Sequence, residues 1–141
     1  MPKGPIAPEF HDLLESDAFA FVSTLGKDGE PQVNPVWFIW DGSHILISLY
    51  EKAQKYVNLT RDNRVAVAIT HSANPYRYVE VRGRVIIEPD LADAVFKAIS
   101  ANYTGGEYSA EPTGTTRYVG RIEVERYTFQ SERPSSPGEG R

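Results

Sequence analysis

The hydrophobic pattern starts with helical spacing near the N-terminus. Ile6, Phe10, Leu13 and Leu14 recur at this spacing, and Pro8 suits the first turn of a helix. The chain therefore begins with a predicted short helix.

Three β-like stretches follow, at residues 18–25, 32–40 and 44–49. The glycine-rich cluster at 26–29 and the Asp41-Gly42 pair predict the turns between them, because Asp-Gly readily supplies the positive φ angles of two-residue hairpins. Together they predict a three-stranded meander.

Short helices and further strands alternate in the rest of the chain. Helical spacing predicts one helix over 52–61. A second predicted helix begins after Asp90, which acts as its N-cap, and runs to about Tyr103. Strands are predicted at 65–69, at 79–87 and around 122–124. Gly83 interrupts the apolar face of its strand, which indicates a β-bulge or a kink where the sheet curves.

About six strands and two or three helices predict a mainly β domain over residues 1–130. We expect an antiparallel β-barrel with short peripheral helices, and the alternative is an open α+β sheet. Closure is favoured because many strands are apolar on both faces. The tail, residues 131–141, has nothing to bury and is expected to be disordered.

Composition narrows the possible functions. The 141 residues carry a formal net charge of −4 and no cysteine, which argues against general nucleic-acid binding and excludes a cysteine nucleophile. Neither a signal segment nor an apolar stretch long enough for a membrane is found, so we expect a cytoplasmic protein that does not enter the membrane. His11, His44 and His71 are far apart in the sequence, so we expect no metal site. A cofactor must then supply the chemistry.

Residues 48–55 leave a strand and enter a helix, which is a geometry that binds phosphate. Unpaired backbone N–H groups and the positive end of the helix dipole converge there. Lys55 adds a positive charge, and Ser48 and Gln54 add neutral donors. The alternative is a solvated helix start with ordinary lysines.

Three segments carry a family resemblance: PQVNPVWF (31–38), NLTRD (58–62) and NPYRYVEVRG (74–83). In this order and spacing they resemble the split-barrel family related to pyridoxamine 5′-phosphate oxidase, in particular its actinobacterial deazaflavin-dependent branch. The resemblance covers roughly residues 10–129. It implies a six-stranded split β-barrel of the FMN-binding type and a homodimer with two cofactor sites at the subunit interface.

The resemblance assigns the phosphate of the cofactor to Lys55. The family has a basic or polar residue just before this lysine, here Gln54, and Ser48 closes the strand below. Many deazaflavin-binding relatives carry an arginine where this chain has Ala53. Either Lys52 or Arg61 then compensates or affinity is lower, and flavin mononucleotide (FMN) stays an alternative cofactor.

The ring system and the second subunit have their own implied contacts. The strand Asn34, Pro35, Val36 and Trp37 resembles the one whose backbone lies against the ring, and Tyr76 and Arg77 resemble the pair that reaches the cofactor from the other chain. Each has a structural alternative: Trp37 as core, Tyr76 as a packing residue and Arg77 as a surface charge.

The implied activity is that of an oxidoreductase in which the reduced deazaflavin coenzyme F420 gives a hydride to an unsaturated small molecule. One alternative is an FMN-binding reductase or oxidase on the same fold, and another is an F420 carrier without turnover. The C-terminal QSERPSSPGEGR lacks the arginine-histidine segment with which vitamin-phosphate oxidases grip their substrate. Oxidation of pyridoxine phosphate is therefore not expected.

Overall fold

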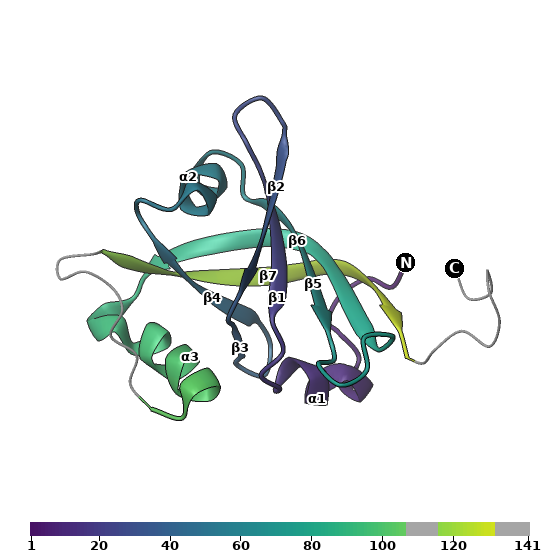
Figure 1. Ribbon diagram of the computed structural model, residues 1–141. Coiled ribbons are helices and arrows are strands. Elements are labelled where there is room, and N and C mark those ends of the chain that lie inside the picture. Colours follow the sequence, from purple (N-terminus) through teal and green to yellow (C-terminus); the bar gives the residue numbers. More distant parts are fainter. Residues whose placement is uncertain (107–115, 132–141) are drawn as a thin grey trace.

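The computed structural model describes residues 1–106 and 116–131 (Figure 1). Apart from Ser131, the predicted disordered tail lies outside the described residues. In chain order, the elements are the 3₁₀ turn η1 (Pro8–Phe10), α1 (His11–Leu14), β1 (Ala20–Leu25), β2 (Pro31–Val36), β3 (Ile39–Trp40), β4 (Ile45–Tyr50), α2 (Gln54–Arg61), β5 (Arg64–Thr70), β6 (Tyr78–Pro89), the 3₁₀ turn η2 (Leu91–Asp93), α3 (Ala94–Thr104) and β7 (Arg117–Gln130).

All the described strands belong to one antiparallel sheet with the order β2-β1-β5-β6-β7-β4-β3. The sheet curls around a core on its concave face (Figure 1), and alternate residues of β1, β5 and β6 are buried in that core. The core includes Val22, Ile45, Ile47, Ile69, Val81 and Ile122, each at most 1% exposed. The predicted mainly β architecture is confirmed.

The two edges of this sheet meet at one point. Strands β2 and β3 are the two edge strands, yet only Trp37 and Phe38 separate them in the chain. Three Cα–Cα steps span at most about 11 Å, so the edges lie next to each other at this link. From there β2 rises toward its hairpin turn and β4 rises toward α2, which gives a split barrel (Figure 1).

This link corrects two predictions. The described strands number seven, not six, because the stretch 32–40 divides at Trp37 and Phe38 into β2 and β3. The predicted three-stranded meander is wrong, since β2 pairs with β1 whereas β3 pairs with β4 at the opposite edge.

The helices cover the open parts of the sheet. Phe10, Leu13 and Leu14 of the N-terminal helical segment are buried, as their spacing predicted. Helix α2 packs against β1 and β4, and α3 packs against β4. The carboxylate of Asp90 accepts hydrogen bonds from the backbone N–H groups of Val95 (3.0 Å) and Phe96 (2.9 Å), so it caps first-turn donors of α3 as predicted. The N-cap residue itself is Asp93 and not Asp90, because the 3₁₀ turn η2 separates Asp90 from the helix.

The bulge predicted at Gly83 is also present. The pairing of β6 with β7 shifts by one residue between Arg82 and Gly83. A Cβ atom on Gly83 would lie 1.8 Å from the carbonyl oxygen of Glu123, so only glycine fits without movement of the backbone.

Candidate anion and cofactor site

Helix α2 begins without a capping side chain. Its N-cap residue, Ala53, makes no side-chain hydrogen bond, and no acidic residue lies in the first turn. The first backbone hydrogen bond of the helix runs from Val57 to the Ala53 carbonyl, and no described residue accepts from the N–H groups of residues 54–56. Three donors and the positive end of the helix dipole are therefore available to an anion.

Lys55 lies in this first turn and is half-buried. Desolvation lowers the pKa of its ammonium group, and no carboxylate of the described residues pairs with it. A partly buried cation without a counter-ion costs free energy in the ligand-free protein. A bound anion would relieve that cost.

The buried side chain of Asn58 joins α2 to the β1–β2 hairpin. This residue is 1% exposed. Its Nδ2 donates to Thr24 Oγ1 and to Gln32 Oε1, both at 3.0 Å. Its Oδ1 accepts from Gln54 Nε2 at 2.8 Å and from Arg61 Nη2 at 3.2 Å.

One further hydrogen bond extends this network to β2, where Gln32 Nε2 donates to Asn34 Oδ1 at 3.3 Å. The structure thus joins three of the sequence-predicted site residues, Asn34, Gln54 and Arg61, through two that were not predicted, Asn58 and Gln32. An asparagine inside a helix carries no sequence signal of burial, and only its position within the NLTRD segment could have singled it out.

Ser48 lies on β4, and Trp37 lies in the link between β2 and β3. Ser48 occupies the face of β4 opposite to the buried Ile47 and Leu49, and its Oγ is buried without a hydrogen-bond partner. Trp37 stacks on Tyr103 of α3 with ring centroids 4.9 Å apart and an interplanar angle of 8°.

Tyr103 holds the link between β2 and β3. Its hydroxyl donates to the Ala18 carbonyl at 2.6 Å and accepts from the Phe38 N–H at 3.1 Å. Burial raises the pKa of Tyr103 to about 12. Pro35 and Val36 lie at the end of β2 that is farther from the hairpin turn, and Trp37 follows them directly in the chain.

Tyr76 and Arg77 lie in the loop between β5 and β6, away from α2. Tyr76 is 40% exposed. Arg77 Nη2 donates to the Glu9 carbonyl at 2.9 Å and to Asp12 Oδ1 at 2.7 Å, and its Nη1 is buried without a partner. Within one chain, Arg77 therefore holds this loop against the N-terminal helix and does not reach α2.

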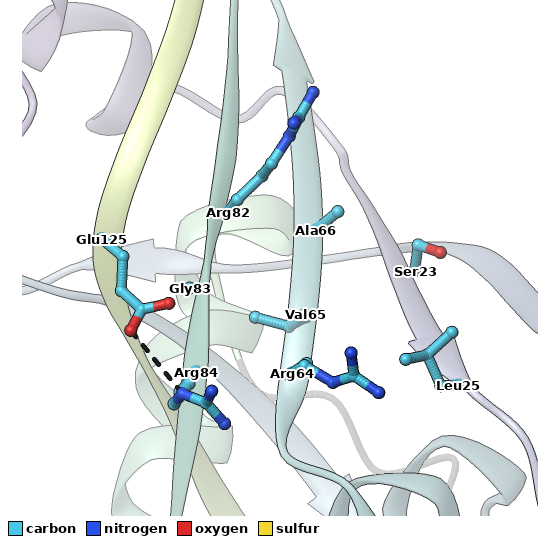
Figure 2. Close-up of a pocket in the computed structure, with 9 residues that line it drawn as sticks. All are labelled: Ser23, Leu25, Arg64, Val65, Ala66, Arg82, Gly83, Arg84 and Glu125. Atoms are coloured by element: carbon cyan, nitrogen blue, oxygen red, sulfur yellow. Dashed lines mark ion pairs between the residues drawn. The ribbon is translucent and has the colours of Figure 1, made fainter. Parts of the chain in front are cut away.

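A separate hollow lies on the outer face of β1, β5 and β6 (Figure 2). Its volume is about 300 Å³, and it exists because Ser23 and Ala66 carry short side chains between longer neighbours. Its three arginines are paired: Arg64 with Asp62 (2.6 Å), Arg82 with Glu80 (3.0 Å) and Arg84 with Glu125 (3.6 Å). This neutralised hollow is a weaker anion site than the start of α2.

In residues 1–106 and 116–131, no three histidine or acidic side chains lie close enough together to hold a metal ion. Within the same ranges, no helix has the length and apolar character needed to cross a membrane.

The curled antiparallel sheet, whose two edge strands meet at one link and separate beyond it, is the fold of a split-barrel protein. Residues 6–131 match the family model of pyridoxamine 5′-phosphate oxidase. The chain belongs to this family, and the resemblance inferred from its sequence motifs is confirmed.

Solved structures agree with this assignment. The structure of an F420 reductase is 32% identical, with a TM-score of 0.78, over 87% of this chain and 98% of that one. The conserved hypothetical protein Rv2991 of Mycobacterium tuberculosis is 26% identical, with a TM-score of 0.74, over 94% of this chain and 89% of that one. HupZ of Group A Streptococcus shares the fold, with 21% identity and a TM-score of 0.66 over 93% of this chain and 99% of that one. A search of curated proteins gave no match.

Proposed function

We propose that this chain is an F420-dependent oxidoreductase that reduces an unsaturated small molecule. The observation that carries the proposal is the start of α2, where three unpaired backbone N–H groups lie beside the half-buried Lys55, which has no carboxylate partner among the described residues. A phosphate group would satisfy both the donors and the charge. Membership of the family and the 32% identity to an F420 reductase favour a deazaflavin as the bearer of that phosphate.

The residues present fit the phosphate end of such a cofactor. Lys55 and the first-turn N–H groups would hold the phosphate. Gln54 and Ser48 would add neutral donors, and the buried hydroxyl of Ser48 has no hydrogen-bond partner in the protein. Arg61 lies at the far end of α2, where it donates to Asn58 and to the Leu25 carbonyl, so it would act on the site through Asn58.

Coenzyme F420, when bound, supplies a hydride donor at ring carbon 5 of its reduced form. The protein orients the two reactants and excludes water, which is how positioning lowers the barrier of such a transfer. The end of β2, from Asn34 to Trp37, would lie against the ring, and Tyr103 would hold Trp37 in place. Hydride addition to an electron-poor double bond leaves an anion that must take up one proton, and Tyr76 or solvent would donate it.

The active form we propose is a homodimer, in which Tyr76 and Arg77 serve the cofactor site of the other chain. Apolar side chains on the outer face of the β1–β2 hairpin support this assembly, since Phe21 is 40% and Val33 is 61% exposed. Light scattering should report a dimer, and Val33→Asp should shift it toward monomer. A wild-type monomer that still binds the cofactor tightly would refute the shared site.

The test of the function is steady-state oxidation of reduced F420 by the purified protein across a panel of enones, quinones and nitro compounds. Turnover with at least one acceptor class is expected. Tight binding of F420 without oxidation by any acceptor would indicate a carrier protein and not a reductase. A protein that is purified with tightly held yellow flavin would replace F420 by FMN, the alternative that Ala53 keeps open. Failure to bind either cofactor would overturn the proposal.

A further inference from the structure

The orientation of the Asn58 amide is fixed by a charge. Arg61 can only donate hydrogen bonds, so the Asn58 atom 3.2 Å from its Nη2 must be the oxygen. The nitrogen of Asn58 then faces Thr24 and Gln32. Since Gln54 approaches the same oxygen, it must present its own nitrogen.

This orientation passes along the network in one direction. Gln32 accepts from Asn58 with its oxygen, so its nitrogen is left to donate to the oxygen of Asn34. The nitrogen of Asn34 is then turned away from Gln32 and has no hydrogen-bond partner among the described residues. Asn58, with two donated and two accepted bonds, uses its full capacity and cannot turn without losing several of them.

We propose that Arg61, Asn58 and Gln32 form a directional relay that makes Asn34 present its N–H₂ group, and not its oxygen, to an acceptor oxygen of the bound cofactor. The inference rests on the proposed function, because it takes the end of β2 as the cofactor site. Asn34 touches the ligand, and the other three are positioning residues. The relay selects ligands that offer a carbonyl or anionic oxygen at this position.

The sharpest variant is Gln32→Glu, which keeps the shape of the side chain. The introduced carboxylate still accepts from Asn58, but it has no proton to donate to Asn34. Asn34 should then turn its nitrogen toward this carboxylate and its oxygen toward the ligand, where two acceptors face each other. Asn58→Asp should have the same effect on Asn34 through Gln32. Gln32 must then turn its nitrogen toward the carboxylate that replaces the Asn58 amide, so that its oxygen faces Asn34.

The experiment is a titration of oxidised F420, followed by fluorescence, with each variant made in the wild-type and in the Asn34→Ala background. Gln32→Glu should weaken binding by about tenfold in the wild-type background, since a donor–acceptor pair is replaced by two acceptors. It should weaken binding by less than about twofold when Asn34 is already alanine. A plain effect of the added negative charge, or of lost stability, would persist in both backgrounds and would overturn the relay.

A second readout needs no cofactor. In the NMR spectrum of the ligand-free protein, a Gln32 side-chain N–H should show contacts to Asn34, and in Gln32→Glu an Asn34 side-chain N–H should show contacts to the introduced glutamate. If the Asn34 amide keeps its orientation in that variant, the relay is refuted. If wild type binds no F420 but the amide turns as expected, the relay stands and the proposed cofactor fails.

Discussion

Replacement of Lys55 by alanine isolates the charge in the candidate phosphate site. The ammonium is half-buried, so water screens it less than a surface lysine, and charge-assisted hydrogen bonds of this kind contribute about 1.5–3 kcal/mol. Affinity for F420 should therefore fall about ten- to a hundredfold. The unpaired N–H groups of the first turn remain, so binding should weaken and not disappear.

The ligand-free stability of the same variant gives an independent check. Lys55 has no counter-ion in the described residues, so its removal should leave the free energy of unfolding within about 0.5 kcal/mol of wild type or raise it slightly. Lys97→Ala is the matched control, because Lys97 is an exposed helical lysine on α3. Equal affinities of Lys55→Ala, Lys97→Ala and wild type would refute the assignment.

The pH dependence of binding follows from the lowered pKa of Lys55. The anion favours the charged ammonium, so affinity should fall as the pH rises through the lowered pKa of the free protein, before the ordinary value of 10.5 is reached. In the ligand-free protein the sign is opposite. The unfolded chain binds more protons in this window, so stability should rise with pH there. Lys55→Ala should lose both effects.

Three further substitutions test the frame around the site in chemical denaturation. Gly83→Ala should destabilise the fold by about 1–3 kcal/mol or more, because its Cβ would collide with Glu123, whereas Gly106→Ala, which meets no atom within 4 Å, should have little effect. Asp90→Ala removes both cap bonds of α3 and should cost about 0.5–2 kcal/mol. Tyr103→Phe leaves the Phe38 N–H and the Ala18 carbonyl without their hydrogen-bond partner and should lower the free energy of unfolding by about 1–3 kcal/mol. In wild type, the stabilising contribution of the Tyr103 hydroxyl should be lost as the pH rises from about 10 to 12, because only the unfolded chain ionises this group in that range.

The strands and helices were predictable because their signals are local. Alternating burial marks β5 and β6, and the glycine that interrupts β6 identifies the bulge. The division of one predicted strand at Trp37 and Phe38 was not predictable, since nothing in the residues themselves states which strand edge each half will meet. That choice belongs to the closure of the whole sheet.

The candidate site was predictable only in part. A lysine in the first turn of a helix that follows a strand is visible in the sequence, and so is the family resemblance around it. The burial of Asn58 was not visible, because a polar residue between Val57 and Leu59 is typical of a solvated helix face. Its partners Thr24 and Gln32 come from strands about thirty residues away, and only the fold brings them together.

The most direct test of the central claim is to locate bound F420 on the protein by two-dimensional ¹⁵N NMR. The backbone amide signals of Gln54, Lys55 and Tyr56 should shift most, because these groups donate to the phosphate, and the signals of Ala66 and Gly83 in the outer hollow should stay unchanged. Saturation of the first-turn amides at the F420 concentration that saturates fluorescence would support the site. Shifts centred on Ala66 and Gly83, with the first-turn amides unmoved, would contradict it.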